Sequence, residues 1–468
     1  MAKVQMKQAS DGILYEVIEY EKNKGTVGRQ RIVFIGASYK FIHKVLRDML
    51  LVGGFDDCEL VLLDIAPEPL RIVGDLLEKM IAQAGSRMKV TRTMDRKAAL
   101  KGAAVALLSI TVGGVEADRR SWEICDKYGV LVTVGDTLGP AALARNIRTL
   151  PVVLGIARDM ERYCPNALLL NFTNPMSCVT GIVNRETSIR CMGLCHSAAD
   201  MEIYFAKVYD EDPKNVEVTV GGVNHQSFVT SVRVRGRERI AHLLEDTAKS
   251  KVQLKDSLYG SSQEMDIQRD LYKILGAWPS CGDTHAAEFY KHFLTKRRYK
   301  ELGLETRKIR KNRRPEPANK PAPAVILKWA YGPGPVEDMD FMTTEHAHEL
   351  MWAALKGKPY TRVVNILNDG YIAGLPKNAC VEVNVTVTKT GYKGKEITMP
   401  TACLALLQQW TAVHELSYAA ARGDWGAARQ ALFLDPLMSD AYDIDPILND
   451  FADRLGKWMP QFVKGRGK

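Results

Sequence analysis

Short apolar runs alternate with helix-like segments through the first part of the chain. Six runs rich in β-branched or large apolar residues have the composition of strands, at 31–35, 60–63, 88–93, 105–110, 130–134 and 168–172. Residues 41–51 and 68–84, which lie between such runs, carry the spacing of amphipathic helices. Strands that alternate with helices form a parallel sheet with helices on both faces. We therefore expect a doubly wound α/β domain over residues 29–195.

The second half of the chain has a different pattern. Residues 216–220 and 228–232 resemble strands and are separated by the segment GGVNHQS. Valines at positions 381, 383, 385 and 387 alternate with other residues over 381–388, which predicts a half-buried antiparallel strand. Residues 401–420 and 425–434 have helical periodicity. We expect an α+β domain over residues 196–463, packed on the first.

The composition of the 468 residues, 46% hydrophobic and 25% charged, is that of a globular protein. No apolar run reaches the roughly 20 residues that a membrane span needs. The first 25 residues mix charges throughout and lack the apolar core of a secretory signal. The nine cysteines occur singly, which favours reduced thiols and a cytoplasmic location. We expect no membrane partner.

The net charge of +9 arises partly from a basic stretch at residues 291–314. Nucleic-acid binding is one explanation for such a stretch. No nucleic-acid-binding motif surrounds it, and only Phe293 and Tyr299 interrupt it with aromatic rings. We therefore favour a solvated surface loop and expect no nucleic-acid partner. Recognition of a small anionic substrate remains an alternative.

A candidate nucleotide site follows the first predicted strand. Gly36, Ala37 and Ser38 form a small-residue turn, Lys40 and Phe41 follow it, and a predicted helix begins there. Such a strand, turn and helix form a phosphate-binding site in Rossmann-like domains. Asp64 ends the second strand, where a carboxylate binds ribose hydroxyls and favours NAD over NADP. The alternative is an ordinary β–α turn in which Asp64 caps the next helix.

Several residues with metal-binding or catalytic side chains follow predicted strands and turns. They are Asn174, Cys195, His196, His225, Asp283 and His285. Asn174 precedes a proline, which favours an extended backbone and lets the side chain project from the end of a strand. Thiolate, imidazole and amide oxygen together suit a divalent transition metal with open positions for substrate. A Cys-His pair taken alone is more often part of a core, and this alternative stays open at this point.

The order of the longer motifs resembles that of the family 4 glycoside hydrolases. The resemblance extends from about residue 30 to 460 and rests on IVFIGAS, LLDIAPEPLRIV, VGGVEADRR, VGDTLGPAALARNIRTLP, LLLNFTNPMS, GLCHS, GGVNHQSF, GDTHAAEF, NDGYIAGLPKNACVEVNV and ALFLDPL. It implies a nucleotide domain similar to that of lactate and malate dehydrogenases. It also implies that the second domain carries the substrate and metal sites and the contacts of a homodimer or homotetramer.

The resemblance implies a glycosidase that uses NAD and a divalent metal, with manganese favoured. In that family NAD oxidises C3 of the sugar, a base removes the C2 proton, the aglycone leaves, water adds and the hydride returns, unlike two-carboxylate hydrolysis. By position, Cys195 and His225 are the expected metal ligands, and Asn174 holds substrate hydroxyls. His196 is the expected acid, and Asp283 is the expected C2 base with His285 beside it.

Two departures from the family pattern stand out in this sequence. The nucleotide turn has one glycine fewer than the Gly-Ala-Gly-Ser that is usual in the family, and bulky Tyr39 and Lys40 follow it. Where relatives often carry a tyrosine near the site, this chain has Ala277-Trp278-Pro279. The second departure removes one candidate base and assigns the role to Asp283.

The substrate and the class of function leave alternatives. The sequence CHS after Gly-Leu resembles the branch that acts on unphosphorylated α-galactosides or uronides, and the basic stretch also makes a sulfonated sugar attractive, as in NAD-dependent sulfoquinovosidases. A 2-hydroxy-acid dehydrogenase is the main rival, but that class needs no Cys/His metal pair. A non-catalytic sensor of NAD and sugar is a third hypothesis. Such a sensor would be expected to lose Cys195, His225 or Asp283, and all three are present.

Overall fold

The computed structural model describes residues 5–8, 14–17, 20–250, 252, 254–256, 261–263, 265–302, 322–342, 346–438 and 443–466. Parallel strands make up the first part of the main sheet: β3 (Arg31–Ile35), β4 (Glu59–Leu63), β5 (Lys89–Thr93), β6 (Val105–Leu108), β7 (Leu168–Asn171) and β8 (Arg190–Gly193). Their spatial order is β5-β4-β3-β6-β7-β8. This is the strand order of a doubly wound dinucleotide-binding fold.

Helices cover both faces of the parallel strands. They are α1 (Ile42–Val52), α2 (Pro67–Gln83), α3 (Arg96–Leu100), α4 (Gly114–Lys127), α5 (Gly139–Tyr163) and α6 (Met176–Glu186). Along β3, Ile32 and Phe34 belong to one core cluster, whereas Val33 and Ile35 belong to another. Successive side chains of a strand point to opposite faces, so both faces of this sheet are buried. The expected doubly wound domain is confirmed.

The strand expected at residues 130–134 is wrong. This segment is an irregular loop before α5, although Val130, Val132 and Val134 are all buried. The backbone N–H groups of Thr133 and Val134 donate to the carboxylate of Glu288 instead of to a neighbouring strand. A run of buried residues therefore produced a strand-like pattern in a loop.

Antiparallel strands continue the same sheet. They are β9 (Val216–Val223), β10 (Gln226–Val234), β11 (Arg237–Glu238), β14 (Trp278–Pro279), β15 (Tyr360–Leu367), β16 (Cys380–Thr388) and β17 (Gly391–Gly394). β15 joins the parallel part by pairing Asn365 with Gly193 of β8, and the order then runs β15-β16-β9-β10-β11. The predicted strands at 216–220, 228–232 and 381–388 are confirmed. Since β8 ends just before residue 195, the proposed domain boundary lies where the sheet changes from parallel to antiparallel.

The remaining helices pack around this sheet. They are α7 (His196–Val208), α8 (Leu243–Ser250), α9 (Asp266–Leu275), α10 (Asp283–Ala286), α11 (Lys296–Glu301), α13 (Ala324–Tyr331), α14 (Ala347–Lys356), α15 (Thr401–Ala421), α16 (Trp425–Leu434), α17 (Ile444–Leu455) and α18 (Pro460–Gly465). Two small hairpins pair β1 (Gln5–Gln8) with β2 (Leu14–Val17) and β12 (Leu254–Asp256) with β13 (Ser261–Gln263). None of the helices in the described ranges is long and apolar enough to cross a membrane.

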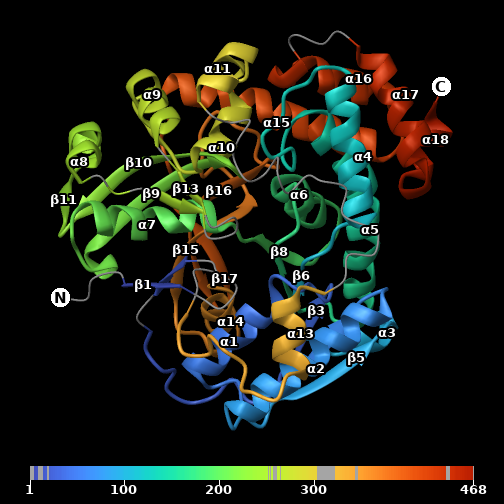
Figure 1. Ribbon diagram of the computed structural model, residues 1–468, viewed down its shortest axis with the longest axis vertical. Helices are drawn as coiled ribbons and strands as arrows, with labels where there is room; N and C mark the ends of the chain where they lie inside the picture. Colours follow the sequence, from blue (N-terminus) through green and yellow to red (C-terminus); the bar gives the residue numbers. More distant parts are fainter. Residues whose placement is uncertain are drawn as a thin grey trace.

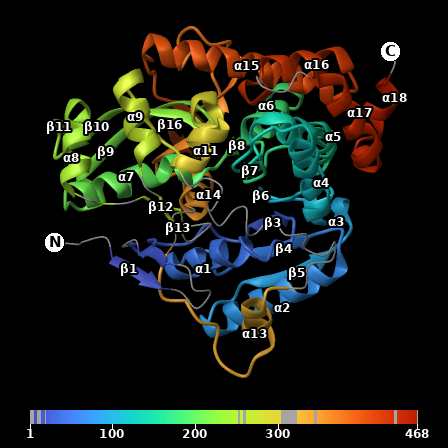
Figure 2. The same cartoon turned by 45° about the horizontal axis from the view of Figure 1, so that its top comes forward.

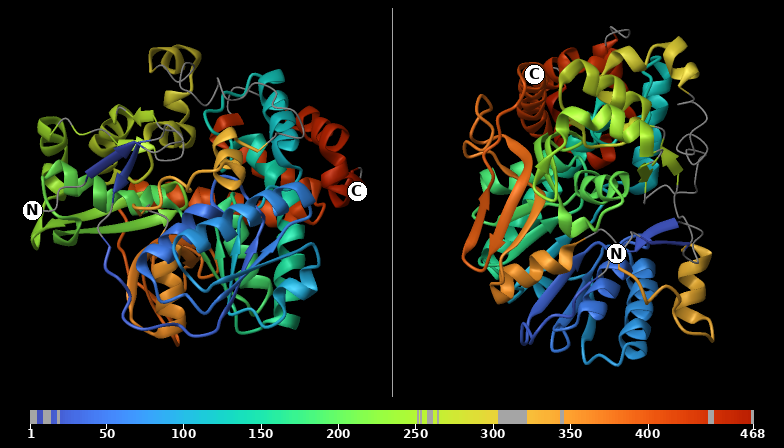
Figure 3. Two further views of the ribbon diagram at one scale, coloured as in Figure 1. Left: turned by 60° about the horizontal axis from the view of Figure 1, so that its bottom comes forward. Right: turned by 90° about the vertical axis from the view of Figure 1, so that its left-hand side faces the viewer.

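The C-terminal helices and the first domain lie on opposite sides of the molecule. Helices α15 to α18 form a layer at the top of Figures 1 and 2, and the blue strands and helices of the first domain lie at the bottom. Figure 3 shows the same separation from the side, with α13 beside the first domain. There Lys79 and Gln83 of α2 donate to the backbone oxygens of Gly332 and Val336.

The basic stretch falls partly outside the described residues. Within the described part, Lys296–Glu301 is the short helix α11 and not a loop, and Arg297 and Arg298 pair with Glu301. Lys296, Arg297 and Lys300 are exposed, as expected for a solvated face. Residues 303–314 of the stretch lie outside the described ranges.

Candidate active site

Gly36 lies where the predicted nucleotide turn leaves β3. Its φ is 101°, and a Cβ there would lie 2.1 Å from the carbonyl oxygen of Ser109. Both features require glycine at this position. The N–H of the next residue, Ala37, donates to Asp64 Oδ2 over 2.6 Å. Residues 36–38 and Asp64 therefore form one local unit at the ends of β3 and β4.

Asp64 has two structural contacts. Besides the Ala37 bond, its Oδ1 accepts the N–H of Ala66, the N-cap residue of α2, over 2.8 Å. Asp64 thus holds the turn that leads into α2, although α2 has no side-chain cap, and the same carboxylate also holds the nucleotide turn. Each carboxylate oxygen has two lone pairs, so these bonds leave acceptor capacity for a ribose hydroxyl.

Lys40 and Phe41 close the turn before α1. Lys40 is exposed, and its N–H donates to Ser38 Oγ over 3.3 Å. The ring of Phe41 lies against that of Phe172, with 4.1 Å between centroids. Phe172 directly follows β7 and is two residues before Asn174. The nucleotide turn therefore lies beside the strand end that leads to the predicted substrate residue.

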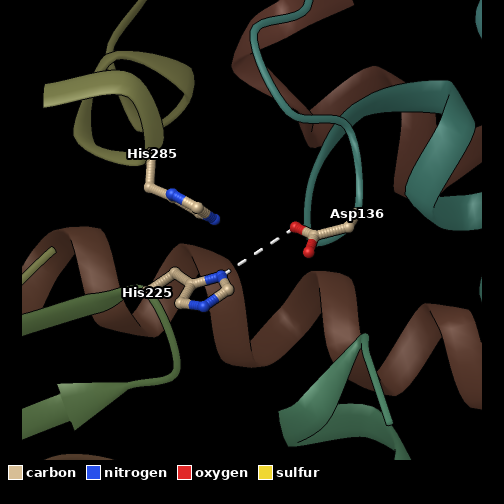
Figure 4. A group of neighbouring side chains, drawn as sticks. All are labelled: Asp136, His225 and His285. Carbon is tan, nitrogen blue, oxygen red and sulfur yellow. Dashed lines mark ion pairs between the residues drawn. The ribbon is translucent and has the colours of Figure 1, made fainter. Parts of the chain in front are cut away.

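Asp136, His225 and His285 converge on one point from three segments (Figure 4). Their potential ligand atoms all lie within 4.8 Å of one another. His225 occupies the turn between β9 and β10 with a φ of 65°, His285 lies on α10, and Asp136 lies on the loop before α5. Two imidazoles and one carboxylate form a donor set that suits a divalent transition metal.

Burial and nearby charges shift the pKa values of His285 and Asp136 toward the forms that bind metal. Burial lowers the pKa of His285 to about 3, with the charge of His225 adding to the effect and that of Asp136 opposing it. Burial alone would raise the pKa of Asp136, but His225 and His285 outweigh it and the pKa is lowered. Neutral imidazole and ionised carboxylate are the ligating forms.

Asn174 is joined to this group. Its Nδ2 donates to Asp136 Oδ2 over 2.8 Å. Its buried Oδ1 has no hydrogen-bond partner among the described residues. A buried amide oxygen without a partner is unfavourable in a finished core, so it fits a position that receives a substrate hydroxyl.

Cys195 lies near the group without being part of it. It occupies the N-cap position of α7 and is half-buried. Burial and the negative charge of Glu382 raise its pKa, and His196 and Ser197 oppose this. The close group found in the described residues contains His225 but not Cys195. His196 begins α7, and its charge contributes to the lowered pKa of His285.

A hydrogen bond joins Asp283 to α9 and not to the two histidines. It begins α10, is 0% exposed, and its Oδ1 accepts the N–H of Gln268 in α9 over 3.2 Å. Residues two apart on a helix do not share a face, so Asp283 and His285 address different neighbours. The carboxylate that the structure brings beside the two histidines is Asp136, which the sequence-based prediction omitted. Its position inside the motif VGDTLGPAALARNIRTLP was the available signal.

Glu382 is a second residue that the prediction omitted. It is 1% exposed on β16 and accepts hydrogen bonds from Asn224 Nδ2 at 3.0 Å, Asn365 Nδ2 at 2.9 Å and Ser227 Oγ at 2.6 Å. Asn224 and Ser227 flank the turn of His225. The buried carboxylate therefore stabilises that turn through its hydrogen bonds with Asn224 and Ser227.

Comparisons with known proteins show two family models matched in order along the chain. The family 4 glycosyl hydrolase model matches residues 31–211, and the model of its C-terminal domain matches residues 220–438. An alpha-galactosidase of Bacillus subtilis is 30% identical over 92% of this chain and 100% of its own. An alpha-galacturonidase of the same organism is 27% identical over 76% of this chain and 82% of its own.

A solved structure shows the same fold. A 6-phospho-alpha-glucosidase from gut microorganisms, in complex with NAD and Mn2+, superimposes with a TM-score of 0.77 at 18% identity, over 92% of this chain and 99% of that one. The matches to glycosidases along almost the whole chain disfavour the 2-hydroxy-acid dehydrogenase considered above. With 30% identity to a glycosidase of full length and both family models matched in order, the chain belongs to the family 4 glycosyl hydrolases.

Proposed function

We propose that the protein is an NAD- and Mn2+-dependent glycosidase that cleaves an unphosphorylated α-glycoside. One observation carries the proposal: the Asp136, His225 and His285 group, joined through Asn174 to the strand end beside the nucleotide turn. The proposed redox step needs a hydride acceptor, and a metal held beside it would polarise the sugar oxygens. The family relative bound to NAD and Mn2+ supports this pairing.

The turn at residues 36–38 and Asp64 would bind NAD. Bound there, NAD supplies a hydride acceptor for C3 of the sugar and returns the hydride at the end of the cycle. The single glycine and the bonds of Asp64 to Ala37 and Ala66 keep the turn compact, and the Asp64 carboxylate favours NAD because it repels a 2′-phosphate.

His225, Asp136 and His285 would hold the metal, and Cys195 is the further ligand that the family resemblance predicts. The metal supplies Lewis acidity to the oxygens on C2 and C3. Asn174 Oδ1 orients one of these hydroxyls. A base on the chain then removes the C2 proton, which the C3 ketone acidifies, and His196 protonates the leaving oxygen at C1.

Asp283 remains our predicted C2 base, and the geometry defines how to test it against Asp136. Asp283→Asn should keep Mn2+ and NAD affinity but lose C2 proton exchange, whereas Asp136→Asn should lose Mn2+ affinity. If Asp136→Asn binds Mn2+ normally and loses only the exchange, the two roles are reversed.

The mechanism is tested by running the reaction in deuterium oxide. Deuterium at C2 of the released sugar supports it, because neither a direct hydrolase nor a simple dehydrogenase exchanges that proton while releasing an aglycone. Released sugar that keeps protium at C2, together with no isotope effect on a C2-deuterated substrate, refutes it.

The substrate class rests on the Cys195-His196-Ser197 sequence and on relatives named as an alpha-galactosidase and an alpha-galacturonidase. Galactoside, glucuronide or galacturonide, and sulfoquinovoside are the candidates. A panel of neutral and acidic nitrophenyl α-glycosides, assayed with NAD and Mn2+, separates them. Activity confined to 6-phosphorylated sugars would refute this choice.

We also propose that the enzyme works in the cytoplasm as a homodimer or homotetramer. None of the nine cysteines is in a disulfide, which supports a reducing compartment. Light scattering after size-exclusion chromatography tests the assembly, and a monomer at micromolar concentration would refute it.

A further inference from the structure

Glu288 binds the backbone of the loop that carries Asp136. It lies in the 3-10 helix η3 (Ala287–Phe289) and is 1% exposed. Its Oε1 accepts the N–H groups of Thr133 at 2.7 Å, Val134 at 2.6 Å and Gly135 at 2.9 Å. Its Oε2 accepts from Gly135 as well, at 3.1 Å.

Three successive N–H groups aimed at one carboxylate form a concave anion-binding turn. Gly135 has a φ of 72°, the left-handed conformation that brings successive N–H groups to one side of the backbone. Since the turn is buried, these N–H groups need an acceptor from the protein. The conformation of the loop therefore depends on the Glu288 carboxylate.

The loop is fixed on both sides of Asp136. Before it, Thr133 Oγ1 donates to the carbonyl oxygen of Thr284 over 2.5 Å. After it, the N–H of Gly139 donates to Asp435 Oδ2 over 2.7 Å. Between these anchors, Thr137 Oγ1 lies 2.8 Å from His225 Nδ1. The loop thus reaches the metal-binding group from a rigid frame.

Glu288 and His285 lie three residues apart in one continuous helical segment, α10 followed by η3. The same short segment therefore carries one member of the group and the anchor for another. A displacement of this segment would therefore affect both His285 and the carboxylate that holds the Asp136 loop.

We propose that Glu288 is a positioning residue that sets Asp136 against His225 and His285 and thereby sets the affinity for the divalent metal. This inference rests on the proposed function, because it assumes that the group binds Mn2+. It assigns Glu288 no contact with substrate or cofactor. Its effect passes through the backbone of residues 133–135 to the Asp136 carboxylate.

The test compares Glu288→Gln with the wild type and with a control. Glutamine has nearly the same shape, but it lacks the charge and turns an amide N–H toward one of the loop donors. Hydrogen exchange by mass spectrometry reports the amides of 133–135, and isothermal titration reports Mn2+ and NAD affinity. Glu161→Gln is the control, because Glu161 accepts the N–H and Oγ–H of Ser188 near the C-terminal end of α5, whereas the loop precedes the N-terminal end of that helix.

In Glu288→Gln we expect faster exchange at 133–135 and Mn2+ affinity weaker by about 10-fold or more, the usual effect of losing a residue that orients a metal ligand. NAD affinity should not change, because Glu288 binds the backbone of residues 133–135, whereas the Gly36 turn is held by Asp64. Activity should recover at high Mn2+ concentration. Glu161→Gln should match the wild type in all these measurements.

The outcomes distinguish failure of the positioning role of Glu288 from failure of the proposed metal site. If the wild type binds Mn2+ and Glu288→Gln binds it with equal affinity, the positioning role of Glu288 is overturned, but the proposed metal site is not. Wild type that binds no Mn2+ overturns the proposed metal site and this inference with it. If Glu288→Gln fails to fold, Glu288→Asp replaces it in the test, because aspartate keeps the charge but is shorter by one methylene. Glu288→Asp must then show the same selective loss of Mn2+ affinity. Unchanged Mn2+ affinity in Glu288→Asp also overturns the positioning role.

Discussion

Replacing Gly36 by alanine tests the nucleotide turn directly. Gly36 combines a φ of 101° with a close approach to the backbone of Ser109, whose carbonyl oxygen would lie 2.1 Å from the new Cβ. The N–H of Ser109 donates to Ile35 O over 2.9 Å, so this carbonyl is held by the end of the sheet. The turn and the Ser109 backbone cannot both keep their positions in the variant.

The magnitude follows from two separate contributions. A left-handed conformation costs a non-glycine residue about 1–2 kcal/mol. Relieving the overlap with Ser109 by moving packed backbone adds about 1–3 kcal/mol. Gly36→Ala should therefore lower the free energy of unfolding by about 2–5 kcal/mol, a large share of the roughly 5–15 kcal/mol of a typical domain.

Comparison with Gly102→Ala separates the steric contribution at Gly36 from the backbone contribution. Gly102 has a φ of 71°, and a Cβ there would meet nothing within 4 Å, so the variant carries only the backbone contribution. Urea unfolding of both variants should give a difference of about 1–3 kcal/mol, and NAD titration should show weakened binding in Gly36→Ala alone. Equal stabilities of the two variants, with NAD affinity unchanged in both, would refute the reasoning.

Three further predictions concern pH, metal and the support of His225. Burial lowers the pKa of His414 from 6.5 to about 4, so the unfolded chain takes up this proton first as the pH falls. The contribution of His414 to the free energy of unfolding should be fully present above pH 6.5 and should fall by about 3 kcal/mol as the pH decreases toward 4. Urea unfolding at pH 7 and pH 5 should therefore show a smaller decrease in His414→Gln than in the wild type. Cys195→Ser should weaken Mn2+ binding about 10-fold or more and remove the need for reductant, and Mn2+ affinity equal to that of the wild type, or full activity retained after chelator treatment, would contradict a ligand role. Glu382→Leu removes the acceptor of three buried donors and should cost about 3–5 kcal/mol in urea unfolding, whereas Glu382→Gln, which can still accept from Asn224, should cost less.

The parallel sheet could be predicted from the sequence because its strands are buried on both faces. Continuous apolar runs such as 60–63 and 105–108 have few alternatives in a chain of alternating strands and helices. Residues 130–134 satisfied the same criterion and form a loop. Hydrophobic periodicity reports which side chains are buried, but not where the backbone N–H groups find their acceptors, and here Glu288, more than 150 residues later, supplies them.

The candidate site shows the same limit for charged residues. His225, His285 and Asn174 could be selected because their motifs place metal-binding or amide side chains after strands and in turns. Asp283 was predicted as the base because it lies in the Gly-Asp-Thr-His turn and the tyrosine that relatives often carry nearby is absent, but the sequence does not show that positions two apart on a helix, such as Asp283 and His285, face different directions. Once His285 points toward His225, at 4.4 Å between ring centroids, Asp283 is directed toward α9, whose Gln268 N–H it accepts. The carboxylate beside the histidines must then come from another segment. The only one that the group within the described residues contains is Asp136, 89 residues before His225 in the chain and recognisable only after the loop, Glu288 and the His225 turn are assembled.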